Sequence, residues 1–272
     1  MRVAFQGERG AYSEGAAVAL LGESVDAVPC ESFEDVFVAL AGGEVDRAML
    51  PIENSLAGSI HRNFDLMLRH ELHIVDEIAV RIAHNLLVLP GVALADIRTV
   101  ISHPQALAQC EHTLTAMGVR REAAWDTAGS ARRVAAEGLR DVGAIASRRA
   151  AEVWGLEIAR ENIEDDPENF TRFHLLGREA SLPPDGVDAK TSIVFSLDDS
   201  PGVLFKALSV FALRDIDLTK IESRPLRGQR WRYLFYIDFV ARLDSGPAQN
   251  ALRHLQEIAP FLRVLGCYPR RA

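Results

Sequence analysis

Short apolar runs alternate with helix-like patterns through the first half of the sequence, and this alternation restricts the fold more than any other feature. Apolar runs such as residues 3–5, 48–52 and 86–89 are separated by segments with the periodicity of amphipathic helices. Such alternation is typical of βαβ units. Because the series occurs twice, joined around residues 73–85, we expect two α/β lobes with a cleft between them, where small ligands commonly bind.

A polar stretch with two prolines and a glycine, residues 179–188, interrupts this pattern and is interpreted as a linker. Beyond it the expected order is strand, helix, strand, strand, helix, strand, with a turn at 227–229 between the middle strands. A βαββαβ order predicts a four-stranded antiparallel sheet with both helices on one face, the ferredoxin-like arrangement. The expected domains are 1–178 (lobes about 1–75 and 76–170, the chain returning at the end) and 189–272.

Composition excludes several function classes. The net charge of -8, without a basic stripe beside aromatic residues, argues against nucleic-acid binding. The three cysteines are widely spaced and form no CxxC pattern, so neither a disulfide framework nor a metal site is indicated. No apolar run reaches the length of a membrane span, and the N-terminus lacks a signal-peptide core. We therefore expect a cytoplasmic protein without a membrane partner.

Several strand-to-helix turns offer polar groups to a ligand. The segment from Gly7 to Ser13 has glycines that permit a tight turn, and Asn54 and Ser55 close an apolar strand. Ser102 precedes a helix that starts at proline, and Thr127 opens another helix. Each turn taken alone is as well explained by ordinary helix capping. Together they could hold a small, strongly anionic ligand.

The run Asn169-Phe170-Thr171-Arg172-Phe173 lies between an acidic segment and a short apolar strand that we place at residues 174–176. Arg172 could grip a carboxylate with two hydrogen bonds, and Thr171 could hydrogen-bond a leaving hydroxyl. Taken alone, the pair is explained as well by an arginine whose charge balances its acidic neighbours.

The second domain has a glycine turn and a charged strand end that could bind a free amino acid. The first comprises Gly202, Val203, Leu204 and Phe205, and the second comprises Glu222, Ser223, Arg224 and Pro225. A backbone loop and a charged cluster suit the carboxyl and amino groups of such a ligand. The alternative interpretation is a sheet edge that forms a dimer contact. It is compatible with amino-acid binding, because ligand sites often lie at interfaces.

In order and spacing, these motifs together resemble those of bacterial prephenate dehydratase with its regulatory ACT domain, over essentially the whole chain. Pro-Ile-Glu-Asn-Ser at residues 51–55 and Thr-Arg-Phe at 171–173 are the specific parts. The resemblance implies a two-lobed catalytic domain like the periplasmic binding proteins, which converts prephenate into phenylpyruvate in phenylalanine synthesis. It also implies a homodimer or homotetramer regulated by phenylalanine, with no cofactor and no metal.

The resemblance also implies roles for individual residues. The expected catalytic residues are Thr171, Arg172, Phe173, Asn54 and Ser55, and the expected substrate-binding residues are Ser102, Thr127, Ser13 and Glu53. Gly202 to Phe205 and Glu222 to Pro225 would bind the effector. This chain departs from the family pattern at Glu8 and Ala11 in the glycine turn, and at Val203 and Phe205 in the effector loop.

As a mechanistic hypothesis, Arg172 and helix-start amides hold the substrate dianion while Thr171 hydrogen-bonds the departing hydroxide; Glu53 is an alternative acid. Two rival functions remain open at this point. Arogenate dehydratase differs only by an amino group on the substrate side chain. A non-enzymatic sensor would combine a two-lobed solute binder with an amino-acid-binding module.

Overall fold

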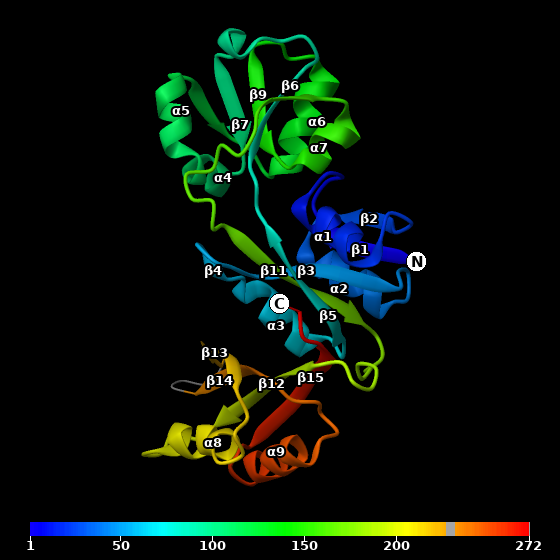
Figure 1. The fold of residues 1–272 in the computed structure, drawn as a ribbon, viewed down its shortest axis with the longest axis vertical. Coiled ribbons are helices and arrows are strands. Elements are labelled where there is room, and N and C mark those ends of the chain that lie inside the picture. The colour runs from blue at the N-terminus through cyan, green and yellow to red at the C-terminus, as the bar shows by residue number, and fades with distance from the viewer. Residues whose placement is uncertain (227–231, 272) are drawn as a thin grey trace. The chain divides into compact units, whose positions relative to one another are not determined.

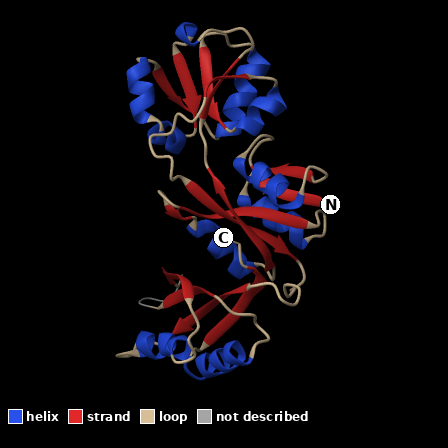
Figure 2. Ribbon diagram, viewed as in Figure 1, coloured by secondary structure: helices blue, strands red, loops and turns tan. Residues whose placement is uncertain are grey.

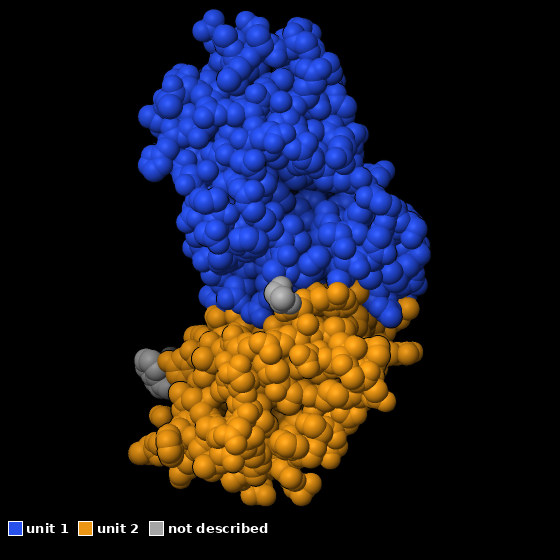
Figure 3. All heavy atoms as spheres, viewed as in Figure 1, with its two compact units in different colours: residues 1–70, 78–174 blue, residues 71–77, 175–272 orange. Residues whose placement is uncertain are grey.

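The computed structural model describes residues 1–226 and 232–271 and divides the chain into two compact units. Unit 1 comprises residues 1–70 and 78–174, and unit 2 comprises residues 71–77 and 175–272 (Figure 3). The turn expected at 227–229 and residue 231 of the following strand lie outside the described residues. Among the described residues, no helix is long and apolar enough to cross a membrane.

Figure 1 labels the helices and strands. They are β1 (Arg2–Gln6), α1 (Tyr12–Leu21), β2 (Asp26–Cys30), α2 (Phe33–Ala41), β3 (Arg47–Asn54), β4 (Gly58–Ser59), α3 (His61–Arg69), β5 (His73–Arg81), β6 (Asn85–Val88), η1 (Leu94–Asp96), β7 (Thr99–Ser102), α4 (Pro104–Gln109), α5 (Glu111–Met117), β8 (Arg120–Ala123), α6 (Thr127–Glu137), β9 (Val142–Ala146), α7 (Arg148–Trp154), β10 (Glu157–Arg160), β11 (Phe170–Gly177), β12 (Ala189–Leu197), α8 (Val203–Ala212), β13 (Leu218–Pro225), β14 (Tyr233–Phe239), α9 (Gly246–Ile258) and β15 (Phe261–Pro269).

The first lobe of unit 1 is built on the strand order β2-β1-β3-β11-β5, of which residues 170–174 of β11 and 78–81 of β5 belong to this unit. Strands β2 and β3 both run parallel to β1, and the fully buried side chains of Phe5 and Met49 occupy paired positions. Parallel strands end at the same edge of a sheet, so the turn after β1 and the turn after β3 lie at one edge. This places the segment that starts at Gly7 on the same side as Asn54.

The second lobe has the strand order β10-β6-β9-β7-β8 and a hydrophobic core on each face. Helices α4 and α5 cover one face, where Leu107 and Leu114 pack against Val100 and Ile145. Helices α6 and α7 cover the other face (Figure 2). Strands buried on both sides read as continuous apolar runs, which is why β9 is so evident in the sequence.

The chain passes between the lobes of unit 1 twice, and the two passages are joined by backbone hydrogen bonds. The amide of Ile82 donates to the carbonyl of Asn169 at 2.7 Å, and the amide of Ile163 donates to the carbonyl of His84 at 2.8 Å. A further contact involves Gly10, whose φ of 92° is unfavourable for other residues. A Cβ at Gly10 would lie 2.6 Å from the Cα of Ala150 in α7, so the turn before α1 requires glycine for packing.

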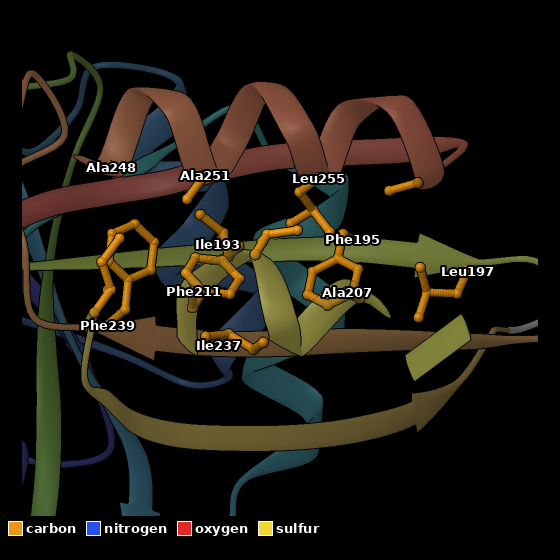
Figure 4. Close-up of a cluster of buried hydrophobic side chains, with 13 residues drawn as sticks. Ile193, Phe195, Leu197, Ala207, Phe211, Ile237, Phe239, Ala248, Ala251 and Leu255 are labelled. Carbon is orange, nitrogen blue, oxygen red and sulfur yellow. The ribbon is translucent and has the colours of Figure 1, made fainter. Parts of the chain in front are cut away.

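Unit 2 confirms the ferredoxin-like prediction. Strand β12 pairs antiparallel with β14 and β15, β14 pairs antiparallel with β13, and α8 and α9 cover one face. Figure 4 shows Ala251 and Leu255 of α9 directed toward Ile193 and Phe195 of β12. The opposite face of β12 carries a buried ion pair, Lys190 with Glu77, at 2.5 Å.

Candidate active site

A pocket of about 430 Å³ opens between the two lobes of unit 1. Its walls come from the ends of β1 and β3, the middle of β11 and the first turns of α1, α4 and α6. Five of the site residues expected from the sequence line this pocket: Ser13, Asn54, Thr127, Thr171 and Phe173. The structure therefore brings together residues that are as far apart in the sequence as Ser13 and Phe173.

Asn54 joins two segments at the floor of the pocket. Its Nδ2 donates to the Thr171 hydroxyl at 2.9 Å, to Asn169 Oδ1 at 2.7 Å and to the carbonyl of Phe170 at 3.1 Å. Its Oδ1 accepts hydrogen bonds from the amides of Leu56 and Ala57. Both ends of the Asn54 amide are thus engaged, which fixes its position.

This arrangement determines how the Thr171 hydroxyl can act. Because Asn54 Nδ2 is a donor, the Thr171 oxygen accepts that hydrogen bond, and the hydroxyl proton remains available for donation. Among the described residues no acceptor for this proton is recorded. Thr171 is thereby oriented as a hydrogen-bond donor toward the pocket.

Ser55 and Ser102 do not line the pocket and have structural contacts. Ser55 Oγ donates to the carbonyl of Glu168 at 2.8 Å and accepts from the amide of Phe170 at 2.9 Å. Ser102 Oγ, which is fully buried, donates to the carbonyl of Ile145 at 2.7 Å. Ser55 anchors the segment before Thr171, and Ser102 joins β7 to β9.

Arg172 and Glu53 are not among the residues that line the pocket, whereas the sequence suggested Arg172 as a clamp for a substrate carboxylate. Arg172 Nη2 contacts Glu53 Oε2 at 2.5 Å. The reason is the start of β11, which begins at Phe170 instead of the expected residue 174. Successive side chains of a strand point to opposite faces, so Thr171 and Phe173 face the pocket and Arg172 does not. The same alternation separates Glu53 from Asn54 on β3.

Replacing Arg172 with lysine should therefore leave the Michaelis constant within about twofold of its original value. The change should instead lower the unfolding free energy by up to about 1 kcal/mol, because a half-exposed ion pair is weakened. Steady-state kinetics and urea unfolding measure the two effects. The matched variant Glu53→Gln weakens the same ion pair from its other side. It should give the same small change in the Michaelis constant and in the unfolding free energy. A tenfold rise in the Michaelis constant for the Arg172 variant alone would place this side chain at the substrate.

A polar network that the sequence reasoning missed continues from Asn169 toward the lobe junction. Gln109 Oε1 accepts from Asn169 Nδ2 at 3.2 Å and lies 2.9 Å from His84 Nε2. His84 Nδ1 lies 2.8 Å from the Tyr12 hydroxyl. Tyr12, His84 and Gln109 all line the pocket. A signal was present for Gln109, which follows Gln105 by four residues and so shares its face of α4.

Burial sets the protonation states in this network. Burial lowers the pKa of His84, against smaller opposing effects from Gln109 and Glu164, and raises the pKa of Tyr12 well above its usual value. A neutral His84 that donates from Nε2 to Gln109 Oε1 has an acceptor at Nδ1, and the Tyr12 hydroxyl proton is shared between this Nδ1 and the carbonyl of Ala83, 2.9 Å away. The network thus holds together as neutral groups.

The lowered pKa of His84 predicts a loss of stability in acid. The unfolded chain takes up a proton at this side chain near pH 6.5, whereas the folded protein takes it up only at lower pH. Stability is therefore fully present above pH 6.5 and falls as the pH drops below it, with a slope of up to about 1.4 kcal/mol per pH unit. His84→Gln should flatten this dependence between about pH 6.5 and 5.

Urea unfolding at a series of pH values measures this slope. The control is His254→Gln, because His254 is exposed on α9 and its replacement should leave the slope as in the original protein. An identical slope in the His84 variant and the original protein would contradict the assignment.

The charge of the pocket differs from the expectation of a cationic clamp. Among the described residues, none of the side chains lining the pocket is a lysine or an arginine, and Asp126 is its one carboxylate. No side chain caps the first turn of α1, where Tyr12 and Ser13 line the pocket, so its amides can receive an anion. Within the described residues, no group of three or more His, Cys, Asp or Glu side chains could hold a metal ion.

The expected effector residues lie in unit 2. Gly202 caps α8 with a φ of 74°, followed by half-buried Val203 and by the exposed side chains of Leu204 and Phe205. The second group, Glu222 to Pro225, occupies the end of β13, which is the terminal strand in the sheet order. The sequence placed both segments at element ends, as the structure has them.

Comparisons with known proteins agree on one family. The prephenate dehydratase family matches residues 3–181, and the ACT domain family matches residues 191–259. A curated relative from Arabidopsis thaliana, arogenate dehydratase/prephenate dehydratase 2, chloroplastic, is 57% identical over 99% of this chain and 73% of its own length. Arogenate dehydratase 2 of Petunia hybrida is 55% identical over 99% of this chain and 72% of its own length.

Solved structures share the fold over nearly the whole chain. Prephenate dehydratase from Arthrobacter aurescens, in complex with L-Phe, has a TM-score of 0.90 and 33% identity, covering 99% of this chain and 90% of that one. A protein described as GqqA, a novel type of quorum quenching acylase, has a TM-score of 0.91 and 37% identity, covering 100% and 98%.

These comparisons correct two expectations. The curated relatives named above are plant enzymes, so the bacterial part of the resemblance is not supported. The prediction of a cytoplasmic location is contradicted, because several relatives from Arabidopsis thaliana are named as chloroplastic. The expectation rested on the lack of a membrane-length apolar run and of a signal-peptide core, and neither observation assigns a compartment.

Proposed function

Because the chain belongs to the prephenate dehydratase family, we propose that it removes carbon dioxide and the ring hydroxyl from prephenate and so forms phenylpyruvate in phenylalanine synthesis. The carbon–carbon bond to the ring carboxylate breaks, its electron pair enters the ring, and the hydroxyl leaves as hydroxide. The dianion thus gives a monoanion, carbon dioxide and hydroxide, and the hydroxide takes a proton to become water. The oxidation levels balance without a redox partner.

One observation carries this proposal: the Thr171 hydroxyl is held by Asn54 so that its proton is directed to the pocket. Aromatisation of the ring supplies most of the driving force, so the protein needs only to hold a reactive conformer and stabilise the departing hydroxide. A threonine hydroxyl is too weak an acid for easy full proton transfer. Thr171 therefore acts as a hydrogen-bond donor to the leaving oxygen, while the open first turn of α1 receives a carboxylate.

Arogenate is the second candidate substrate, because relatives that are 57% and 55% identical carry arogenate dehydratase in their names. Its dehydration follows the same bond changes and yields phenylalanine in place of phenylpyruvate. The pocket carboxylate of Asp126 favours this second substrate, because arogenate carries an ammonium group.

The decisive experiment incubates the purified full chain with prephenate or arogenate and follows phenylpyruvate or phenylalanine. Product from either substrate supports the dehydratase reaction. No product from either would favour the amino-acid sensor. Hydrolysis of an acyl amide, measured in parallel, would instead align the chain with the structural neighbour described as an acylase.

Regulation by phenylalanine is part of the proposal, with the effector bound by the segments Gly202 to Phe205 and Glu222 to Pro225. It is supported by the ACT domain match and by the L-Phe complex of the structural neighbour. We also propose a homodimer or homotetramer, with catalytic domain 1–178, linker 179–188 and ACT domain 189–272. Effector binding would favour one arrangement of subunits and thereby change the active site. Sedimentation as a monomer with and without phenylalanine would contradict this route.

A further inference from the structure

The pocket of unit 1 has an unusual charge for a site that receives a dianion. Asp126 lines it from the N-terminal cap of α6. Arg172 is paired with Glu53, and Arg132 is paired with Glu8. Among the described residues, the lining includes no lysine or arginine to offset the Asp126 carboxylate. A prephenate dianion would therefore meet a fixed negative charge.

The carboxylate of Asp126 has one oxygen committed and one available. Oδ1 accepts a hydrogen bond from the amide of Gly129 and so caps α6. For Oδ2, no partner is recorded among the described residues. The cap also means that the start of α6 already holds its own anion, which makes it a poor place for a substrate carboxylate.

The start of α1 differs, because its own first-turn carboxylate, Glu14, is already bound to the amide of Gly10 and to Arg149. It carries no side-chain cap, and its first residues, Tyr12 and Ser13, line the same pocket as Asp126. One wall can thus receive a carboxylate and another can receive a cation. A zwitterionic amino-acid substrate provides both charges, whereas the corresponding keto acid provides only anions.

We propose that Asp126 is the specificity-determining residue of this site: its Oδ2 receives the α-ammonium group of the substrate, and the enzyme prefers arogenate to prephenate. This assignment rests on the proposed dehydratase function and specifies its substrate class. The α-ammonium offers charge-assisted hydrogen bonds that the keto group cannot donate. The keto acid also leaves the carboxylate unpaired beside a dianion, so discrimination has an attractive and a repulsive part.

The test compares kcat/KM for arogenate and for prephenate in the full chain and in Asp126→Asn. Asparagine has nearly the same size and is an equally good helix cap, so the variant removes the charge and keeps the fold. The ratio of the two kcat/KM values does not depend on the fraction of folded enzyme. We expect the original protein to favour arogenate and the variant to lose about 10- to 100-fold of that preference.

Asp35→Asn is the matched control. Asp35 also stands in the first turn of a helix, where it forms a capping box with Ser32, and it does not line the pocket. The control removes the same charge from the chain and should leave the ratio unchanged. Asp126→Ser, which also caps the helix, should repeat the effect of Asp126→Asn.

Three outcomes would overturn the assignment. The first is that the original protein prefers prephenate. The second is that both Asp126 variants consume both substrates with the same ratio of kcat/KM values as the original protein. A protein inert toward both substrates would remove the proposed function itself and this assignment with it. The second outcome leaves the dehydratase function intact, so the two failures are distinguishable.

Discussion

Replacing Thr171 with valine should lower kcat about 100-fold or more and change the Michaelis constant by only a few-fold. Valine has the shape of threonine but no hydroxyl, so the variant removes the one donor that Asn54 directs to the pocket. Negative charge develops on the leaving oxygen only as the bond breaks. An interaction made mainly in the transition state is lost from kcat and not from ground-state binding.

Steady-state kinetics with the preferred substrate measure this effect, and thermal unfolding shows whether the variant folds. Thr171→Ser keeps a hydroxyl and should recover much of the activity. The matched control is Thr191→Val, which removes another buried hydroxyl, one that donates to the carbonyl of Ala241 in unit 2. The Thr191→Val variant should be less stable than the original protein and should have the same kcat. A Thr171→Val enzyme with kcat within threefold of the original would eliminate the leaving-group role.

Much of the fold could be predicted from periodicity alone. The C-terminal βαββαβ order follows from strongly patterned segments such as α9, whose apolar residues recur at helical spacing, and from a clear linker. Strand β5 (His73–Arg81) was instead interpreted as a joining segment. Its central residues include Asp76 and Glu77, and acidic residues are rare in strands. Glu77 is accommodated there by the buried ammonium of Lys190, which lies far away in the sequence.

The sequence predicted which residues belong to the site better than it predicted where their side chains point. The resemblance pointed to Asn54 and Thr171, which 117 positions separate, and no local pattern could have paired them. The expectation that Thr171 and Arg172 face the same ligand rested on a strand start placed four residues too late. Without the alternation of β11, the sequence places Thr171 and Arg172 beside one ligand.

The network of Tyr12, His84 and Gln109 was missed for a different reason. Each residue alone has an ordinary explanation on its own element, and only the passage of the chain between lobes brings them to Asn169. A polar residue buried by tertiary structure is indistinguishable in sequence from one exposed on a surface. The need to satisfy buried polar groups then selects the partners, which the sequence order does not reveal.

Replacing Asn54 with aspartate should abolish most activity and also destabilise the protein. The carboxylate would still accept from the amides of Leu56 and Ala57, so the turn after β3 keeps its hydrogen bonds. It would, however, face two acceptors, Asn169 Oδ1 and the carbonyl of Phe170, where Nδ2 now donates. It would also accept the Thr171 hydroxyl proton that is now directed to the pocket. We expect kcat to fall about 100-fold or more and the unfolding free energy to fall by about 2–4 kcal/mol.

Ser55→Ala is the neighbouring control, because it removes two hydrogen bonds from the same strand end without touching the pocket. It should cost about 1–2 kcal/mol of stability and leave kcat within a few-fold. Combining Asn54→Asp with Thr171→Val tests whether Asn54 acts through Thr171. If it does, the double variant is hardly slower than Thr171→Val alone, because the hydroxyl that Asn54 orients is already absent. Multiplicative losses in kcat would mean that Asn54 contributes to the reaction independently of Thr171.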